Sequence, residues 1–234
     1  MNFRVSPDVL SRVLPEPFRP KLVKGFGMAG ICLIRLKGIR PRFWPAWAGL
    51  SSENAAHRIA VEWDEGGALR EGVYVPRRDS PSLWNKLAGG RLFPGVHHRS
   101  RFHVRETGDS YHVELSNRDG TRLLVSGHLT ESLPGESVFG TLEQASRFFE
   151  GGSVGYSATG RPGVFDGLEL KTLRWAMQPL AVEKVESSYF ANWTLFPAGS
   201  VEFDCALLMR RIEHEWRGRP RLVVRGCEPA GLSA

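Results

Sequence analysis

Alternating apolar and polar residues dominate the first third of the chain and predict antiparallel strands. Apolar residues recur from Met28 to Ile39, and alternating segments at His57 to Trp63 and Arg70 to Val75 flank Asp64-Glu65-Gly66-Gly67. Alternation with a period of two is typical of strands that bury one face, and a glycine-rich turn between two such segments favours a hairpin. Because Pro76 lacks an amide hydrogen, we expect it to end the second strand.

The middle of the chain predicts a second set of strands with one apolar and one polar face. A turn over Thr107 to Ser110 would give the apolar pairs Phe102–Leu115 and Val104–Val113 and the polar pairs His103–Glu114 and Arg105–His112. Arg118-Asp119-Gly120 then predicts a turn with a left-handed glycine, after which Thr121 to Thr130 returns as a strand. Further strands are expected over Ser153 to Thr159, Gly163 to Trp175, Leu180 to Phe196 and Val201 to Trp216.

Three short helices are expected between these strands. Pro7 to Leu14 follows Ser6 as N-cap, and Ser80-Pro81 opens a similar segment that ends near Ala88. Thr141 and Gln144 have capping-box spacing before an amphipathic segment that ends at Gly151-Gly152. No repeat or linker divides the chain, so we expect one mainly β domain, α+β by helix count, over residues 1–228 and a loose tail over 229–234.

Composition narrows the class of partner. The chain has 234 residues, a net charge of +6 and basic residues scattered among acidic ones, which does not favour a nucleic-acid partner. Its three cysteines lack a CxxC spacing, which argues against a disulfide framework or a zinc ribbon and favours the cytoplasm. No signal-type segment or long apolar stretch is present, so no membrane partner is expected. A homo-oligomer is left open.

The stretch from Gly90 to His98 concentrates the candidate chemistry, because a glycine-proline turn precedes two adjacent histidines. On a strand, His97 would share a face with Arg99 and Arg101, and these guanidinium groups would repel a metal cation. The same face suits a carboxylate or phosphate ligand, with histidine as a general acid or base. A solvent-exposed face is the competing interpretation. No GxSxG, GxGxxG or phosphate-loop motif is present.

Four segments occur in an order that is informative as a set. They are Arg40 to Gly49 with the strand start Glu53 to Arg58, Gly72 to Val75, the Gly90 to His98 turn, and Gly152 to Leu180 with its Trp175 and Pro179. In this order the chain resembles the acetoacetate decarboxylase-like superfamily and, within it, the uncharacterised YqjF-type group. The resemblance implies a closed or nearly closed antiparallel β barrel with a buried small-molecule pocket.

The resemblance also implies a change of chemistry at the turn. Decarboxylases of this family carry two adjacent lysines there, one of which forms a Schiff base with a keto acid. His97 and His98 stand at the corresponding positions here, and Leu92 stands where the family has a glutamate. Because imidazole cannot form an iminium, we do not expect Schiff-base decarboxylation. The arginines beside the histidines argue against a metal, and no other cofactor is expected.

Together these observations predict a cytoplasmic, single-domain barrel that binds a small organic acid or related metabolite. His97 and His98 are the candidate acid–base groups and Arg91 the candidate carboxylate clamp. Further candidate contacts are Arg40, Glu53, Tyr74 and Trp175. Two alternatives stay open, a lyase or hydrolase that uses the histidines for proton transfer and a non-catalytic regulatory or binding module, so the sequence does not decide whether the protein is an enzyme.

Overall fold

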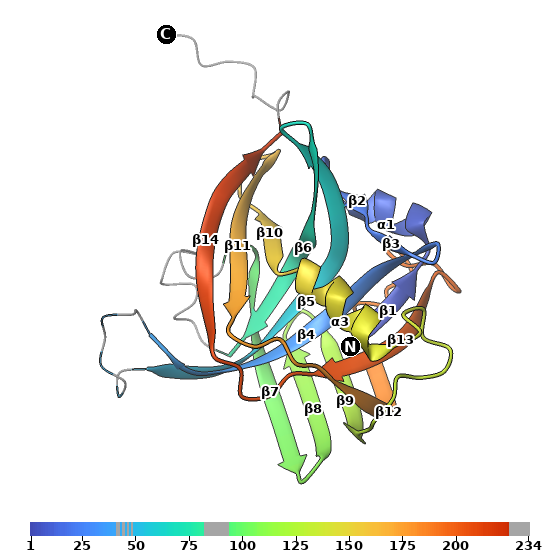
Figure 1. Ribbon diagram of the computed structural model, residues 1–234, viewed down its shortest axis with the longest axis vertical. Coiled ribbons are helices and arrows are strands. Elements are labelled where there is room, and N and C mark those ends of the chain that lie inside the picture. The colour runs from blue at the N-terminus through green and yellow to red at the C-terminus, as the bar shows by residue number, and fades with distance from the viewer. Residues whose placement is uncertain (41–42, 44, 46, 48, 82–93, 225–234) are drawn as a thin grey trace.

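A computed structural model describes residues 1–40, 43, 45, 47, 49–81 and 94–224 (Figure 1). These ranges are mainly strand, which confirms the mainly β prediction. They contain two α-helices, α1 (Pro7–Val13) and α3 (Leu142–Gly151), so the expected count of three is wrong for the described residues. The helix expected after Ser80 falls on residues 82–93, which lie outside the described residues, and Ser80 itself is the last residue of a strand.

Fourteen strands of the described ranges form one sheet. They are β1 (Asn2–Val5), β2 (Arg19–Pro20), β3 (Leu22–Val23), β4 (Phe26–Ile39), β5 (Leu50–Glu65), β6 (Ala68–Ser80), β7 (His97–Thr107), β8 (Ser110–Asn117), β9 (Arg122–Leu129), β10 (Val154–Ala158), β11 (Val164–Thr172), β12 (Gln178–Ser187), β13 (Val201–Leu208) and β14 (His214–Val223). None of the described helices is long and apolar enough to cross a membrane.

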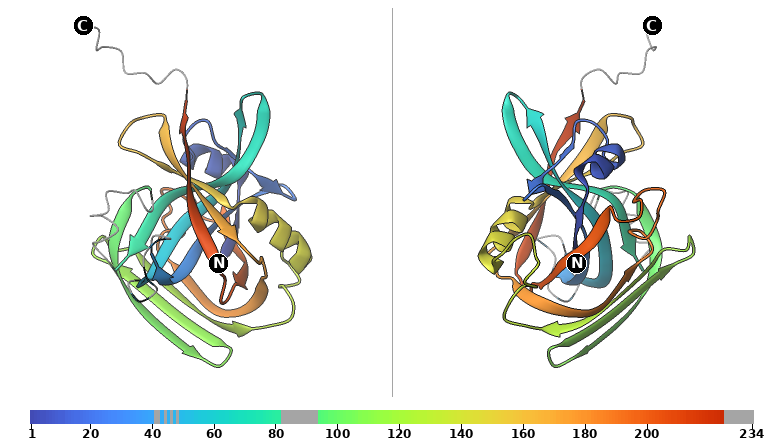
Figure 2. Two further views of the ribbon diagram at one scale, coloured as in Figure 1. Left: turned by 60° about the vertical axis from the view of Figure 1, so that its left-hand side comes forward. Right: turned by 90° about the vertical axis from the view of Figure 1, so that its right-hand side faces the viewer.

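The strand pairings form a closed circuit with a branch at β6. The circuit runs β5, β6, β7, β8, β9, β12, β13, β1 and β4, and β4 pairs with β5 again. β6 pairs in parallel with β10 at Val73 and Tyr74 and with β7 over its last three residues. β10, β11 and β14 therefore stand beside β6 as an extension of the sheet, while the strands of the circuit curl around the middle of the molecule (Figures 1 and 2).

The predicted register of the β7–β8 hairpin is confirmed. β7 and β8 pair Phe102 with Leu115 and His103 with Glu114, as alternation predicts, and Gly120 has a left-handed φ of 89° before β9. The expected stop at Pro76 is wrong, because β6 continues to Ser80. His57 pairs with Arg77 and Ile59 with Tyr74, so two residues of β6 oppose one of β5. Proline is tolerated at such a bulge because the local ladder needs no amide there.

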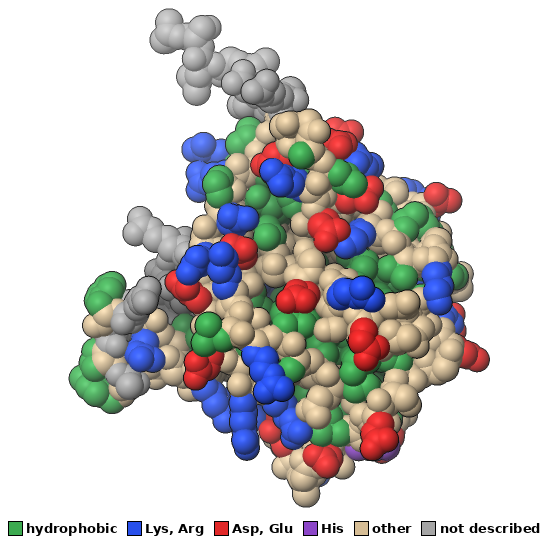
Figure 3. All heavy atoms as spheres, viewed as in Figure 1, with side chains coloured by type: hydrophobic (Ala, Val, Ile, Leu, Met, Phe, Trp, Pro, Cys, Tyr) green, Lys and Arg blue, Asp and Glu red, His purple; other side chains and the backbone are tan. Residues whose placement is uncertain are grey.

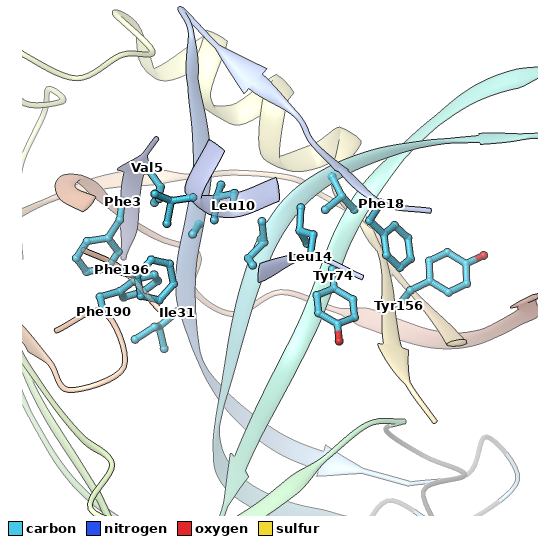
Figure 4. Packing of buried hydrophobic residues seen from close by; sticks show 14 of the residues in the cluster. Phe3, Val5, Leu10, Leu14, Phe18, Ile31, Tyr74, Tyr156, Phe190 and Phe196 are labelled. Atoms are coloured by element: carbon cyan, nitrogen blue, oxygen red, sulfur yellow. The ribbon is translucent and has the colours of Figure 1, made fainter. Parts of the chain in front are cut away.

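The main core fills the inner side of the circuit. Phe190 and Phe196, from the β12–β13 connection, pack with Phe3 of β1 and Ile31 of β4, and the Phe3 and Phe190 ring centroids are 4.3 Å apart (Figure 4). Residues 188–200, expected in part as strand, form turns instead. Their aromatic content reflects burial against the core rather than a strand ladder.

A second apolar cluster lies under α3. The helix places Ala145 and Phe149 against Phe139 and Met28 of β4. Its predicted cap is confirmed, because the Thr141 side chain accepts a hydrogen bond from the Gln144 amide at 3.2 Å. The cluster therefore joins the helix to β4, β5 and β13, which contribute Met28, Ala60 and Cys205.

Candidate functional site

The two adjacent histidines begin β7 and point to opposite sides of the sheet. In the short parallel pairing of β6 with β7, Arg78 is the register partner of His97 and Asp79 is the register partner of His98. Because successive side chains of a strand alternate between faces, each pair occupies one face of the same junction. The junction therefore carries two distinct polar groups, one on each side.

A cavity of about 30 Å³ lies on the His97 side, partly open to solvent. It is lined by the polar residues Asn54, Arg78, Asp79, Ser80 and His97 and by the apolar residues Ile34, Leu36, Ala55, Ala56 and Trp216. The register aligns Cys32, Ala56, Arg78 and His97 in one row across β4, β5, β6 and β7. A volume of this size holds roughly one or two water molecules or the head of a small ligand.

Arg78 is the principal charge of this cavity. Its Nε donates a hydrogen bond to the Pro94 carbonyl at 2.8 Å, and it forms no ion pair with any carboxylate of the described residues. Burial lowers the pKa of its guanidinium to about 10, which still leaves it charged at neutral pH. A half-buried cation without a carboxylate partner favours the binding of an anion.

Gly95 fixes the carbonyl that Arg78 uses. Its φ of 111° lies in the left-handed region that favours glycine, and a Cβ there would sit 2.7 Å from the Ser157 Cβ of β10. The close approach of this turn to β10 holds the Pro94 carbonyl in place beside the guanidinium. From the sequence, the glycine-proline turn was expected only to precede the two histidines. In the structure it also positions the carbonyl that accepts a hydrogen bond from Arg78.

On the opposite face, basic and acidic side chains alternate in one network of polar contacts. Arg77 donates to both carboxylate oxygens of Asp79 at 2.8 and 2.9 Å and to Asp119 Oδ2 at 2.8 Å. His57 Nδ1 lies 3.6 Å from Asp79 Oδ2, and His98 Nδ1 lies 3.2 Å from Asp119 Oδ2. The contacts therefore run from His57 of β5 to Asp79 and Arg77 of β6, then to Asp119 in the β8–β9 turn and finally to His98 of β7.

Protonation states in this chain follow from burial and hydrogen bonding. Burial lowers the pKa of His57 to about 4, although the nearby Asp79 opposes that shift, so His57 is neutral at pH 7. Burial alone would raise the pKa of Asp79, but hydrogen bonds from Arg77 and Ser100 outweigh it and hold that pKa below its ordinary value. The hydrogen bond from Arg77 likewise holds the pKa of Asp119 well below its usual range.

Tyr189 covers the inner end of this chain. Its ring packs against His57 in a tilted arrangement with centroids 4.5 Å apart, and burial raises the pKa of its hydroxyl to about 12. Asp79 also accepts a hydrogen bond from Ser100 Oγ at 2.7 Å, which ties β6 to β7. The network is therefore a rigid support that orients β6 and β7 and, with them, Arg78 and His97 on the other face.

Of the residues expected to form the site, His97 lines the cavity and His98 belongs to the opposite network. Glu53 forms an ion pair with Arg35 and faces away from the cavity-lining Asn54 beside it. Tyr74 packs in the core with Phe18 at a ring-centroid distance of 5.5 Å.

Three further expected residues lie elsewhere. Trp175 packs in the cluster under α3. Arg40 donates to the Gly38 carbonyl at 3.3 Å near the end of β4 and is not among the residues that line the cavity. Arg91 lies outside the described residues. Of the candidates within the described residues, His97 alone lines this cavity.

Arg78 is the cavity-lining cation that sequence reasoning missed. The pair Arg77-Arg78 was visible, but the expected stop at Pro76 removed both arginines from the strand and hence from any face of the sheet. Arg99 and Arg101, expected beside His97, are exposed and do not line the cavity. No group of three or more His, Cys, Asp or Glu residues is placed to hold a metal ion in the described part of the chain.

Comparison with known proteins decides the family. The model of the DUF2071 family, described as "Uncharacterized conserved protein", matches residues 1–203. The chain belongs to the DUF2071 family. No curated protein matches the DUF2071 chain.

Solved structures show the fold of this DUF2071 protein. An acetoacetate decarboxylase-like enzyme from Sphingomonas wittichii RW1 has a TM-score of 0.53 and 12% identity, covering 95% of this chain and 86% of its own. An acetoacetate decarboxylase has a TM-score of 0.57 and 11% identity, and the match covers 95% of this chain and 86% of the decarboxylase. The enduracididine biosynthesis enzyme MppR, complexed with pyruvate, has a TM-score of 0.54 and 11% identity, and the match covers 95% of this chain and 85% of MppR. The expected resemblance to the acetoacetate decarboxylase-like superfamily is confirmed, and the identities establish the fold alone.

Proposed function

We propose that this DUF2071 chain, which has an acetoacetate decarboxylase-like fold, binds a small organic acid in the cavity at the β6–β7 junction. One observation carries the proposal: the Arg78 guanidinium lines the cavity and forms no ion pair with a described carboxylate. A carboxylate ligand would supply the missing charge and accept two charge-assisted hydrogen bonds from the guanidinium. The pyruvate complex of MppR, a protein of the same fold, is consistent with a ligand of this class.

The remaining lining residues give the cavity a polar and an apolar side. His97 lies beside Arg78 in register and can donate to the ligand or exchange a proton with it. Asn54 and Ser80 supply further polar groups, and Leu36 and Trp216 supply an apolar wall. The volume of about 30 Å³ fits the acid group, so a larger ligand would extend through the open side.

We further propose that the site operates without a Schiff base. No lysine lines the cavity in the described part of the chain. His97 and His98 face opposite sides of the sheet, so they cannot act together on one substrate, and an acid–base role in a lyase or hydrolase would fall to His97 alone. Arg91 stays a proposed second clamp because it lies only three residues before Pro94 in the sequence.

Thermal shift and calorimetry with acetate, propionate, pyruvate and phosphate would test the binding proposal. We expect at least one carboxylate to stabilise the protein, and Arg78→Met to abolish that shift. Because Arg78→Met removes a half-buried cation that has no carboxylate partner, the ligand-free variant should melt no lower than the wild type. Arg217→Met is the matched control, since Arg217 is exposed and paired with Glu215 at 2.8 Å. An unchanged ligand shift in Arg78→Met would contradict the proposal.

A further inference from the structure

Three arginines gather on the outer face of β7, β8 and β9, away from the core. Arg99 and Arg101 of β7 and Arg122 of β9 are exposed, whereas Ser100 and Leu123, their sequence neighbours, are buried. None of the three arginines lines the cavity at the β6–β7 junction. The arginine cluster therefore lies beside the proposed organic-acid site on the same face of β7, without being part of its lining.

The strand register places the cluster around one hydroxyl group. Arg101 is the partner of Ser116, and Ser116 is the partner of Arg122, so the three residues form one row across the three strands. Arg99 lies two residues from Arg101 on the same face of β7, a separation of about 6.6–6.8 Å along a strand. Ser116 is itself exposed. Arg101 and Arg122 thus flank the exposed Ser116 in this row, and Arg99 lies one position further along the same face of β7.

The cluster lacks the counter-charges that some of the other exposed arginines of this protein have. Arg19 pairs with Asp64 at 2.7 Å and Arg221 with Asp166 at 2.7 Å. No ion pair or hydrogen bond joins the side chain of Arg99, Arg101 or Arg122 to a carboxylate of the described residues. The carboxylate in the adjoining row, Glu114, already accepts a hydrogen bond from His112 at 2.8 Å.

The surroundings of the cluster select one class of partner. The exposed large apolar side chains of the described residues all lie outside β7, β8 and β9, so this face offers neither aromatic platforms for bases nor apolar anchors for a bilayer. An extended peptide with acidic residues at alternate positions presents carboxylates every 6.6–6.8 Å, roughly the spacing of Arg99 and Arg101. Arginine binds carboxylates in a bidentate manner.

We propose that Arg99, Arg101 and Arg122 form a docking surface for an extended acidic segment of a partner protein. Alternate carboxylates of that segment pair with Arg99 and Arg101, and a further carboxylate bridges Arg101 and Arg122 over the Ser116 hydroxyl. The contact uses exposed charges, so it is weak per residue, depends on ionic strength and selects partners by charge pattern. Figure 3 shows that acidic and basic side chains are interspersed over much of the visible surface, with Lys and Arg gathered in the region where Figure 1 labels β7.

Fluorescence anisotropy with a labelled peptide of alternating Glu and Thr tests this surface directly. We expect wild-type binding that weakens on the order of fivefold for each arginine lost, in Arg101→Gln and in Arg101→Gln with Arg122→Gln. The matched control is Arg217→Gln with Arg221→Gln, which removes the same charge from exposed, ion-paired arginines of β14. The control should bind the peptide as the wild type does, and all variants should melt as the wild type does.

Three results would overturn the proposal. The first is a lack of peptide binding by the wild type, and the second is equal weakening in the β14 control, which would reduce the effect to net charge. The third is tighter, Arg101-dependent binding of an oligouridylate or of phosphatidylserine vesicles, which would assign the surface to nucleic acid or membrane instead. Carboxylate-induced stabilisation through Arg78 should be retained in the Arg101 and Arg122 variants, so failure here is separate from failure of the organic-acid site.

Discussion

Arg78 and His97 are register partners on one face of the β6–β7 junction, directly behind Asp79 and His98 on the other. The first pair borders a cavity and the second belongs to a hydrogen-bonded network. The cavity and the side-chain network therefore lie on opposite faces of the same sheet, and Asp79 of the network also borders the cavity. This arrangement allows variants that alter the cavity without touching the network, and the reverse.

Filling the cavity should block the ligand while leaving its cation in place. Ala56 lies between Cys32 and Arg78 in the same row, and Ala56→Val adds two carbon atoms to the floor of the cavity. We expect carboxylate affinity to fall by about tenfold or more, with a stability change of about 1 kcal/mol or less because the cavity absorbs part of the added volume. Calorimetry measures the affinity. Ala191→Val, at an exposed turn position, should change neither quantity.

The Gly95 turn offers a test of how Arg78 is positioned. Gly95→Ala forces a side chain against Ser157 at a φ of 111°, so the turn and its Pro94 carbonyl must shift. We expect a loss of about 1–3 kcal/mol in the free energy of unfolding and weaker carboxylate binding. Gly108→Ala is the control, since Gly108 also has a positive φ of 59° but has nothing near its Cβ. Equal ligand affinity in both variants would show that the turn does not position Arg78.

Stability should fall as the pH drops from about 6.5 to about 4, because of His57. Its folded pKa of about 4 lies below the ordinary 6.5, so the unfolded state binds a proton in this window and the folded state does not. The loss is at most about 3 kcal/mol. Urea unfolding at pH 7, 5.5 and 4.5 measures it.

The variant His57→Phe keeps a ring against Tyr189 and should flatten this pH dependence. His128→Phe alters an exposed histidine and should leave the dependence as in the wild type. The lowered pKa values of Asp79 and Asp119 add stability that is present above their ordinary pKa of 3.8 and is lost as the pH falls below it, so they act in a separate, more acidic window. A wild-type stability that stays constant between pH 6.5 and 4.5 would contradict the assignment to His57.

Removing the charge of Asp79 should destabilise the fold. Asp79→Asn leaves Arg77 without its bidentate partner in a buried position, and we expect a loss of about 3 kcal/mol. The exposed Asp64, which pairs with Arg19 at 2.7 Å, provides the comparison, because Asp64→Asn should cost about 1 kcal/mol or less. Chemical unfolding measures both. Similar losses in the two variants would show that the network adds no more than a surface ion pair.

Local patterns predicted the parts of the fold that local contacts determine. The Phe102–Leu115 and His103–Glu114 pairs follow from alternation around one short turn, and the α3 cap follows from Thr141 and Gln144. The segment containing Tyr189 and Phe196 misled the strand prediction, because its aromatic residues fill the core from turns. Burial favours the same residue types in both cases, so composition cannot separate them.

The candidate site was harder to predict because non-local pairing builds it. Trp216 reaches the cavity from β14, far along the chain, and Arg78 reaches it only because β6 continues past Pro76 through a bulge. Neither the bulge nor the parallel pairing of β6 with β7 has a local signature in the sequence. His97 was found because the residue type and the preceding turn drew attention to it.

The branch at β6 has a consequence for how ligand size can change. Arg78 sits on the circuit, whereas Trp216 on the facing wall belongs to β14, which follows β6 through β10 and β11 along the sheet. The width of the cavity is thus set by how strongly that run of strands curls. A side chain at Gly155 or Gly167 would alter the fit between β10 and its neighbours. Such substitutions would therefore change the width of the cavity, and the size of ligand that it can hold, without altering a residue that lines it.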